Sequence, residues 1–149
     1  MPEGLEVIVR EVGYDPRTAE GRALILTIPP HSDVRTGPPA FTEYSIRPTW
    51  TPAAGEGLCR ASVTSVTVHV QVKMPVGVSV PQETWLRRHE DGHLRLIVEH
   101  SIALLERMDA LEGLTCPRLT WRAEALVRRT DRELAQAHAR YDGRGQETP

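Results

Sequence analysis

The sequence predicts an α+β domain, in which an N-terminal antiparallel β-sheet is followed by a long helix and a second, C-terminal helix. Residues 1–80 are rich in Val, Thr, Pro and Gly and include segments with strand-like alternation. Residues 81–142 contain few Gly or Pro and repeat apolar residues at three- and four-residue steps, which predicts a helical hairpin. Because strands come first and helices second, the helices are expected to pack on or beside the sheet. A chain of 149 residues suits a single domain, 1–149, with a flexible tail at 143–149.

The first half supplies the strands. Residues 5–12 predict a strand, 23–28 form a short apolar stretch, 42–50 alternate weakly, and 53–57 are typical of a turn. The clearest strand spans 60–73. Its even positions place one set of side chains on one face (Val66, Val68, Val70 and Val72), and its odd positions place polar ones on the other (Thr67, His69, Gln71 and Lys73). This alternation predicts a half-buried strand of an antiparallel sheet.

The second half supplies two helices. Pro81 is tolerated at a helix start, and the apolar spacing that follows predicts a helix over 82–109. A break falls at 112–114. Thr115 is a suitable N-cap for a second helix, which is expected to end at Asp142-Gly143.

Charge and hydropathy exclude some classes of partner. The net charge is −2 and the pI is about 6.3, so the basic excess of a nucleic-acid-binding protein is missing. No apolar run reaches the ~20 residues of a membrane helix. The first residues lack the basic and apolar regions of a signal peptide, so we expect a cytoplasmic protein as written, or a secreted one if the chain is a mature form.

The two cysteines, Cys59 and Cys116, are too few for a tetrathiolate zinc site. They are either two buried thiols or one disulfide closing a loop of about 57 residues, worth about 4 kcal/mol in the chain-entropy model.

The segment His89-Glu90-Asp91-Gly92-His93 is an HExxH motif within the first predicted helix. Residues i and i+4 lie one turn apart on the same helix face, so both imidazoles can reach one cation. Two imidazoles suit Zn²⁺, and Glu90 is placed to act as the general base. A polar stripe on a surface helix is the alternative interpretation. Gly92 permits close approach of a substrate or a neighbouring backbone, or is simply tolerated.

A catalytic zinc usually has three protein ligands, and the sequence does not identify the third one here. His100 is about 10.5 Å beyond His93 along a helix, which is too far for a shared ion. The candidates lie mostly on the second helix. They are His138, Glu147, Asp142 and Glu124, with Glu133 also possible. A site without a third protein ligand is the other possibility, and His31 and His69 are expected at the surface.

Taken together, these residues resemble a bacterial domain-of-unknown-function family described as predicted secreted zinc-dependent proteases. The specific parts of the resemblance are the HEDGH segment and the terminal Tyr141-Asp142. Less specific similarities extend over nearly the whole chain (Gly13-Tyr14 with a polar, helix-like stretch after it, Gly37-Pro38, Thr42 with Trp50, Cys59, Met74-Pro75 and Cys116). Family members tend to continue Tyr-Asp-x-x-Thr-x-His-Gly, and here Glu147 stands in the position of that His.

The resemblance implies zinc at His89 and His93, Glu90 as general base, and a disulfide or close approach of Cys59 and Cys116. We therefore expect a zinc metallohydrolase, and specifically a metallopeptidase acting on a peptide. In this hypothesis His138 and Glu147 are the candidate third ligands and Asp142 orients a ligand histidine. Tyr141 either donates a hydrogen bond to the oxyanion or packs at the helix end. The alternatives are a metal-dependent biosynthetic enzyme with a small-molecule substrate, and a non-catalytic binding module with a vestigial HExxH.

Overall fold

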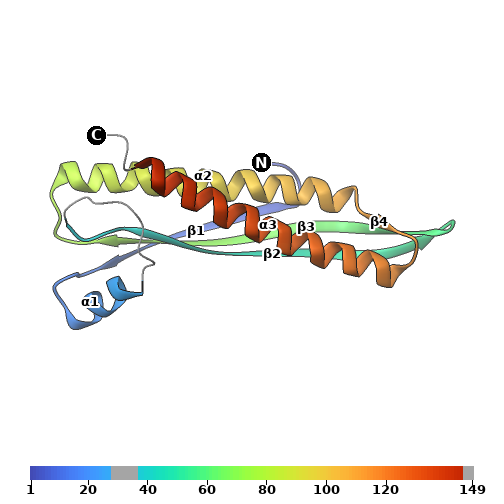
Figure 1. Cartoon of the computed structure of the whole chain (residues 1–149), viewed down its shortest axis with the longest axis horizontal. Helices are drawn as coiled ribbons and strands as arrows, with labels where there is room; N and C mark the ends of the chain where they lie inside the picture. Colours follow the sequence, from blue (N-terminus) through green and yellow to red (C-terminus); the bar gives the residue numbers. More distant parts are fainter. Residues whose placement is uncertain (28–36, 146–149) are drawn as a thin grey trace.

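Strand β3 (Leu58–Pro75) is the centre of the sheet in the computed structural model, which describes residues 1–27 and 37–145. It pairs antiparallel with β2 (Phe41–Gly55) and parallel with β1 (Leu5–Tyr14), which gives the order β1-β3-β2. A two-residue strand, β4 (Glu112–Gly113), pairs with the first part of β3. The predicted α+β class is therefore confirmed, and the sheet is mixed: the antiparallel arrangement holds for β2 and β4 but not for β1 (Figure 1).

The direction of β1 has a topological reason. Strands β2 and β3 are joined by a tight turn, which forces them to run antiparallel. Between β1 and β3 the chain passes through a helix and the whole of β2. That connection is long enough to bring the chain back to the starting end of β1, as a parallel pair requires.

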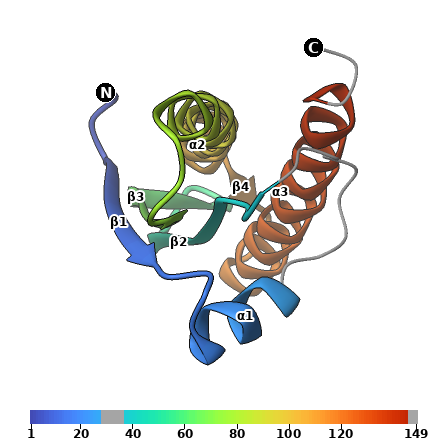
Figure 2. The same cartoon turned by 90° about the vertical axis from the view of Figure 1, so that its left-hand side faces the viewer.

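The β-rich half also contains a short helix, α1 (Ala19–Leu26), which follows Tyr14, where the resemblance includes a helix-like stretch. Thr18 is its N-cap, and its side-chain oxygen accepts a hydrogen bond from the Gly21 N–H at 2.9 Å. The apolar stretch expected at 23–28 is the end of this helix, and residue 28 lies outside the described ranges. In Figure 2, α1 lies on the side of the sheet opposite α2.

Two long helices cover the other face of the sheet, α2 (Val80–Asp109) and α3 (Cys116–Gly145). Helix α2 begins two residues before the predicted start at 82, with Pro81 in its first turn, and α3 begins after Thr115 as expected. Ser79 caps α2 by accepting from the Gln82 N–H at 3.3 Å, and Thr115 accepts from the Arg118 N–H at 3.2 Å. Helix α3 continues to Gly145 and so takes up the first part of the predicted tail at 143–149, the rest of which lies outside the described residues.

The core lies between the sheet and these helices. Val66, Val68 and Val70 are at most 2% exposed, which confirms the predicted inward face of β3. They belong to one cluster with apolar side chains of β1 and both long helices (Leu5, Ile97, Leu104, Leu105, Met108, Ala123 and Leu134). His69, on the opposite face of β3, is exposed as expected.

Cys59 and Cys116 form a disulfide, which settles the two alternatives left by the sequence and confirms the pairing implied by the resemblance. The bond joins β3 to the first residue of α3 and closes a separation of 57 residues. It therefore fixes the N-terminal end of α3 against the sheet.

Helices α2 and α3 run in opposite directions, so the last turns of α3 lie beside the first half of α2 (Figure 1). This packing brings residues 138–142 next to the HExxH segment. Within the described ranges, none of the helices is both long and apolar enough to cross a membrane.

Candidate metal centre

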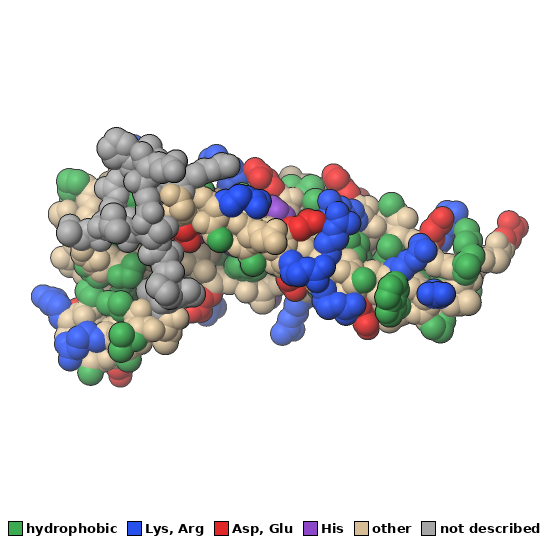
Figure 3. Space-filling view, in the orientation of Figure 1, with side chains coloured by type: hydrophobic (Ala, Val, Ile, Leu, Met, Phe, Trp, Pro, Cys, Tyr) green, Lys and Arg blue, Asp and Glu red, His purple; other side chains and the backbone are tan. Residues whose placement is uncertain are grey.

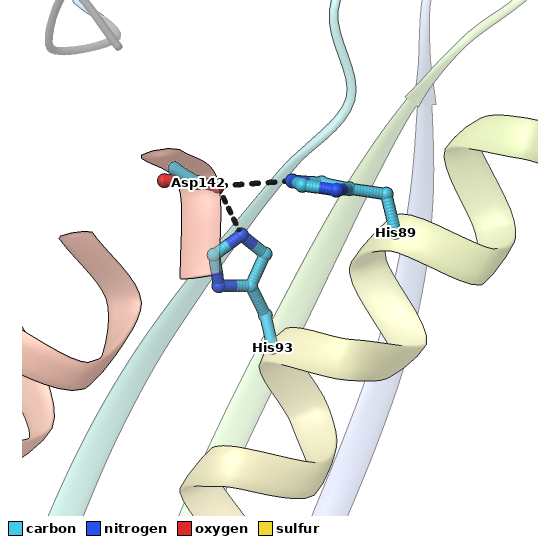
Figure 4. Close-up of side chains that lie close together, drawn as sticks. All are labelled: His89, His93 and Asp142. Carbon is cyan, nitrogen blue, oxygen red and sulfur yellow. Dashed lines mark hydrogen bonds and ion pairs between the residues drawn. The ribbon is translucent and has the colours of Figure 1, made fainter. Parts of the chain in front are cut away.

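His89 and His93 extend from one face of α2 toward the end of α3, where both rings meet one carboxylate (Figure 4). Their Nε2 atoms lie 2.9 Å and 2.7 Å from the same oxygen, Asp142 Oδ1. The four-residue spacing of the histidines produces this geometry because it places them one helical turn apart. The predicted pairing of the two imidazoles is therefore present, and the carboxylate completes a three-residue cluster.

The cluster has the donor set of a zinc site. One ligand atom from each of His89, His93 and Asp142 lies within 4.8 Å of the other two. His89 and His93 are 9% and 8% exposed, and the Asp142 side chain is 19% exposed. Two imidazole nitrogens and one carboxylate oxygen suit zinc, and three protein ligands leave one coordination position open. The side chains present thus fit the metal that the resemblance implies.

His138 contacts this cluster from the other side of the His93 ring. Its Nδ1 lies 2.7 Å from His93 Nδ1, whereas Asp142 faces His93 Nε2. Burial and the neighbouring His93 lower the pKa of His138 to about 4, so its ring is neutral at pH 7. Among the candidates on α3, the carboxylate of Asp142 therefore meets the Nε2 atoms of both histidines, whereas the ring of His138 meets only His93.

Glu90 follows His89 in α2 and is 4% exposed. Its Oε2 accepts a hydrogen bond from the Thr42 hydroxyl of β2 at 2.5 Å. Burial raises the pKa of Glu90, while the hydrogen bond from Thr42 and the nearby histidines oppose that shift. A carboxyl group with a raised pKa takes up a proton more readily than an ordinary glutamate, which is a property of general bases.

Tyr141 packs between the two helices. Its ring stacks on His89 at a centroid distance of 4.8 Å, and its hydroxyl donates to the His89 backbone carbonyl at 2.9 Å. Burial raises the pKa of Tyr141, and the charges of Glu90 and Asp142 raise it further. In this arrangement the single phenol proton is used to join the helices. The oxyanion role predicted for Tyr141 therefore requires the hydroxyl to exchange partners.

Gly92 is the reason that Tyr141 can approach so closely. A Cβ atom at position 92 would lie 2.0 Å from the Tyr141 hydroxyl oxygen and 2.3 Å from the ring carbon that carries it. The neighbour expected at Gly92 was a substrate or a backbone. It is instead the Tyr141 side chain.

Three residues contact the site but were not predicted from the sequence to belong to it. Trp85 stacks on His89 at a centroid distance of 5.2 Å, Tyr44 packs on His138 at 5.3 Å, and Thr42 binds Glu90. The contact of Trp85 could have been predicted, because Trp85 precedes His89 by four residues and so lies on the same helix face. Thr42 and Tyr44 reach the site only through the packing of β2 against the helices.

The remaining candidate residues are elsewhere. His100 Nδ1 lies 2.9 Å from the Leu96 carbonyl oxygen of its own helix, and His100 is not one of the three residues of the cluster. Glu124 is exposed, and Glu133 pairs with Arg129 and Arg107 on the surface. His31 and Glu147 lie outside the described residues.

The surface seen in Figure 3 carries interspersed basic and acidic side chains, with a histidine visible among them. No extended area of one charge sign dominates the described part of this face. This pattern agrees with the small net charge of −2.

A family model described as "Bacterial protein of unknown function (DUF922)" matches residues 14–148. The chain belongs to this family. The DUF922 match includes every residue of the cluster described above, and it confirms the family resemblance predicted from HEDGH and Tyr141-Asp142. No curated protein and no solved structure matches the chain. The zinc and protease assignments implied by the resemblance therefore stay predictions, and the geometry of the site is the basis for a functional proposal.

Proposed function

We propose that this DUF922 protein is a zinc-dependent metallopeptidase. The observation that carries the proposal is the convergence of His89, His93 and Asp142 on one point beside the buried Glu90. Exposed acidic and histidine clusters are common without a metal. This cluster is mostly buried, and it combines the donor set of zinc with a carboxyl group of raised pKa.

His89, His93 and Asp142 would hold the ion, and Glu90 follows His89 directly in the same helix. A bound zinc ion supplies Lewis acidity, which lowers the pKa of a water ligand and polarises a substrate carbonyl. The contribution of Glu90 is to accept a proton from the nucleophile and to donate it to the leaving amine. Thr42 orients Glu90 through its hydrogen bond, because that bond fixes one of the two carboxylate oxygens. Tyr141 and Trp85 hold the His89 ring between them, which limits its rotation.

The first test is the metal content of untagged protein, measured by elemental mass spectrometry. We expect about one zinc per chain, with loss of zinc in His93→Ala and Asp142→Ala. The matched controls are His69→Ala and Asp131→Ala, because both residues are exposed and lie away from the cluster. Absence of zinc in the wild-type protein after reconstitution would refute the proposal.

The second test is cleavage of a peptide library, followed by mass spectrometry. Glu90→Gln should retain zinc and lose activity, whereas Glu99→Gln, an exposed residue of the same helix, should keep both. Zinc binding without peptide cleavage would refute the peptidase assignment and favour the small-molecule enzyme. Zinc binding with Glu90→Gln indistinguishable from wild type in every assay would favour a binding module.

We further propose that the protein works in an oxidising compartment. The support is the Cys59–Cys116 disulfide, because structural disulfides persist mainly outside the reducing cytosol. Alkylation with a mass-tagged maleimide in intact cells, before and after reduction, measures the state of the pair. Two reactive thiols before reduction would refute this localisation.

A further inference from the structure

The contact between His93 and His138 restricts where their protons can be. The two Nδ1 atoms are 2.7 Å apart, which is hydrogen-bond distance. A neutral imidazole has one N–H and one lone pair. If both rings are neutral, one Nδ1 must donate and the other must accept. The state of one ring therefore determines the state of the other.

The opposite nitrogen of His93 decides the direction of this bond. His93 Nε2 lies 2.7 Å from Asp142 Oδ1, and an ionised carboxylate only accepts hydrogen bonds. When this hydrogen bond forms, the proton of His93 is on Nε2 and its Nδ1 is an acceptor. His138 Nδ1–H must then be the donor, and His138 Nε2 has the lone pair.

A metal at the same site requires the reverse arrangement. A neutral histidine binds a metal through a lone pair, so Nε2 of His93 must give up its proton and Nδ1 must hold one. His93 Nδ1–H then donates to His138, whose proton must be on Nε2. Each ring loses one proton and gains one by exchange with water, so the net charge of the pair does not change.

We propose that His138 is a positioning residue for the metal site, and that zinc binding reverses the tautomers of His93 and His138 together. This inference rests on the proposed zinc site and deepens it. It explains why a histidine precedes Asp142 by four residues on α3, since this spacing directs both side chains toward His93. A histidine can accept in one state and donate in the other, as the reversal requires.

The surroundings of His138 fit such a role. Its ring packs on Tyr44 of β2, and its neighbours Leu134 and Ala137 are buried, so the ring is held in place. Among the described residues, His138 Nε2 is buried without a hydrogen-bond partner. A proton on that atom is therefore costly, because an unpartnered buried N–H loses its hydration. The metal-bound arrangement must compensate for this cost, so His138 should influence zinc affinity as well as ring orientation.

The experiment is long-range ¹H–¹⁵N NMR of the histidine rings in labelled full-length protein at pH 8, with EDTA and then with one equivalent of zinc. The His93→Ala and His138→Asn spectra assign the signals. We expect Nε2–H on His93 and Nδ1–H on His138 without metal, and the reverse for both rings with zinc. Zinc bound while the His138 tautomer stays unchanged would overturn this inference and leave the proposed function intact. No zinc bound would overturn both.

Zinc affinity provides a second readout, measured by competition with a chromophoric chelator. His138→Leu should weaken zinc binding about 10–100-fold, the usual effect of losing a residue that orients a ligand histidine. His138→Asn should recover most of the affinity, because its side-chain oxygen can accept from His93 Nδ1–H. Circular dichroism confirms that each variant is folded. Equal affinity of the folded Leu variant, the Asn variant and wild type would contradict the proposal.

Discussion

Gly92 offers a sharp test of how the HExxH helix packs against α3. Glycine inside a helix ordinarily destabilises it, so replacing it by alanine at an open helical position gains about 0.5–1 kcal/mol. At position 92 the expectation is reversed. The added Cβ would lie 2.0 Å, 2.3 Å and 2.8 Å from three atoms of Tyr141, all far inside van der Waals contact. The Tyr141 ring cannot easily give way, because it packs against both His89 and His93.

The magnitude follows from two costs and one gain. Overpacking in a well-packed site costs about 1–3 kcal/mol, and loss of the hydrogen bond from Tyr141 to the His89 carbonyl adds about 1 kcal/mol. The gain in helix propensity returns up to about 1 kcal/mol. We therefore expect Gly92→Ala to lower the free energy of unfolding by about 1–3 kcal/mol. Because Asp142 follows Tyr141 directly, zinc binding should weaken as well.

The assay is urea unfolding of four proteins: wild type, Gly92→Ala, Tyr141→Ala and the double variant. In the Tyr141→Ala background the obstacle is gone, so Gly92→Ala should become stabilising by up to about 1 kcal/mol. Gly143→Ala is the matched control, since a Cβ at that helical glycine would meet nothing within 4 Å. It should be neutral or stabilising in both backgrounds.

A neutral or stabilising effect of Gly92→Ala in the wild-type background would refute this reasoning. The same holds for an equal effect with and without the Tyr141 ring, because the cycle would then show no coupling between the two positions.

Three further predictions concern Glu90, Thr42 and the disulfide. Burial raises the pKa of Glu90 above its ordinary 4.5, so the folded protein keeps a proton that the unfolded chain releases. The stability contributed by that proton is present below pH 4.5 and is lost as the pH rises through the raised pKa. In EDTA, urea unfolding of Glu90→Gln should therefore show a growing stability advantage over wild type from pH 4 to pH 8, and a constant difference would contradict it. Thr42→Val removes a hydrogen bond that lowers the pKa of Glu90, so the acidic limb of kcat/KM for peptide cleavage should move to higher pH, while Thr42→Ser should not move it. Replacing Cys59 and Cys116 by alanine should lower the free energy of unfolding by about 4 kcal/mol in the chain-entropy model, as measured by urea unfolding without reductant; a loss below about 1 kcal/mol would contradict it.

Local sequence patterns predicted the parts of this protein that depend on neighbours in the chain. The alternation at Val66, Val68 and Val70 predicted the inward face of β3, because side chains of a strand alternate whatever the strand pairs with. The spacing of His89 and His93 predicted a shared point of contact, because residues four apart lie on one helix face. The same residues, together with Tyr141-Asp142, identified the family.

Features that depend on the packing of distant segments needed the tertiary structure. Side chains alternate between the two faces in parallel and antiparallel strands alike. The sequence of Leu5–Tyr14 therefore could not show that β1 runs parallel to β3. The roles of His138 and Asp142 depend on the rotation and offset of α3 against α2. Both residues lie on the same side of α3, and only the docked helix shows that Asp142 meets both Nε2 atoms while His138 meets His93 Nδ1. The sequence thus determined the two histidines and the adjacent Glu90, whereas the packing of α3 decided which of its residues meet the histidines.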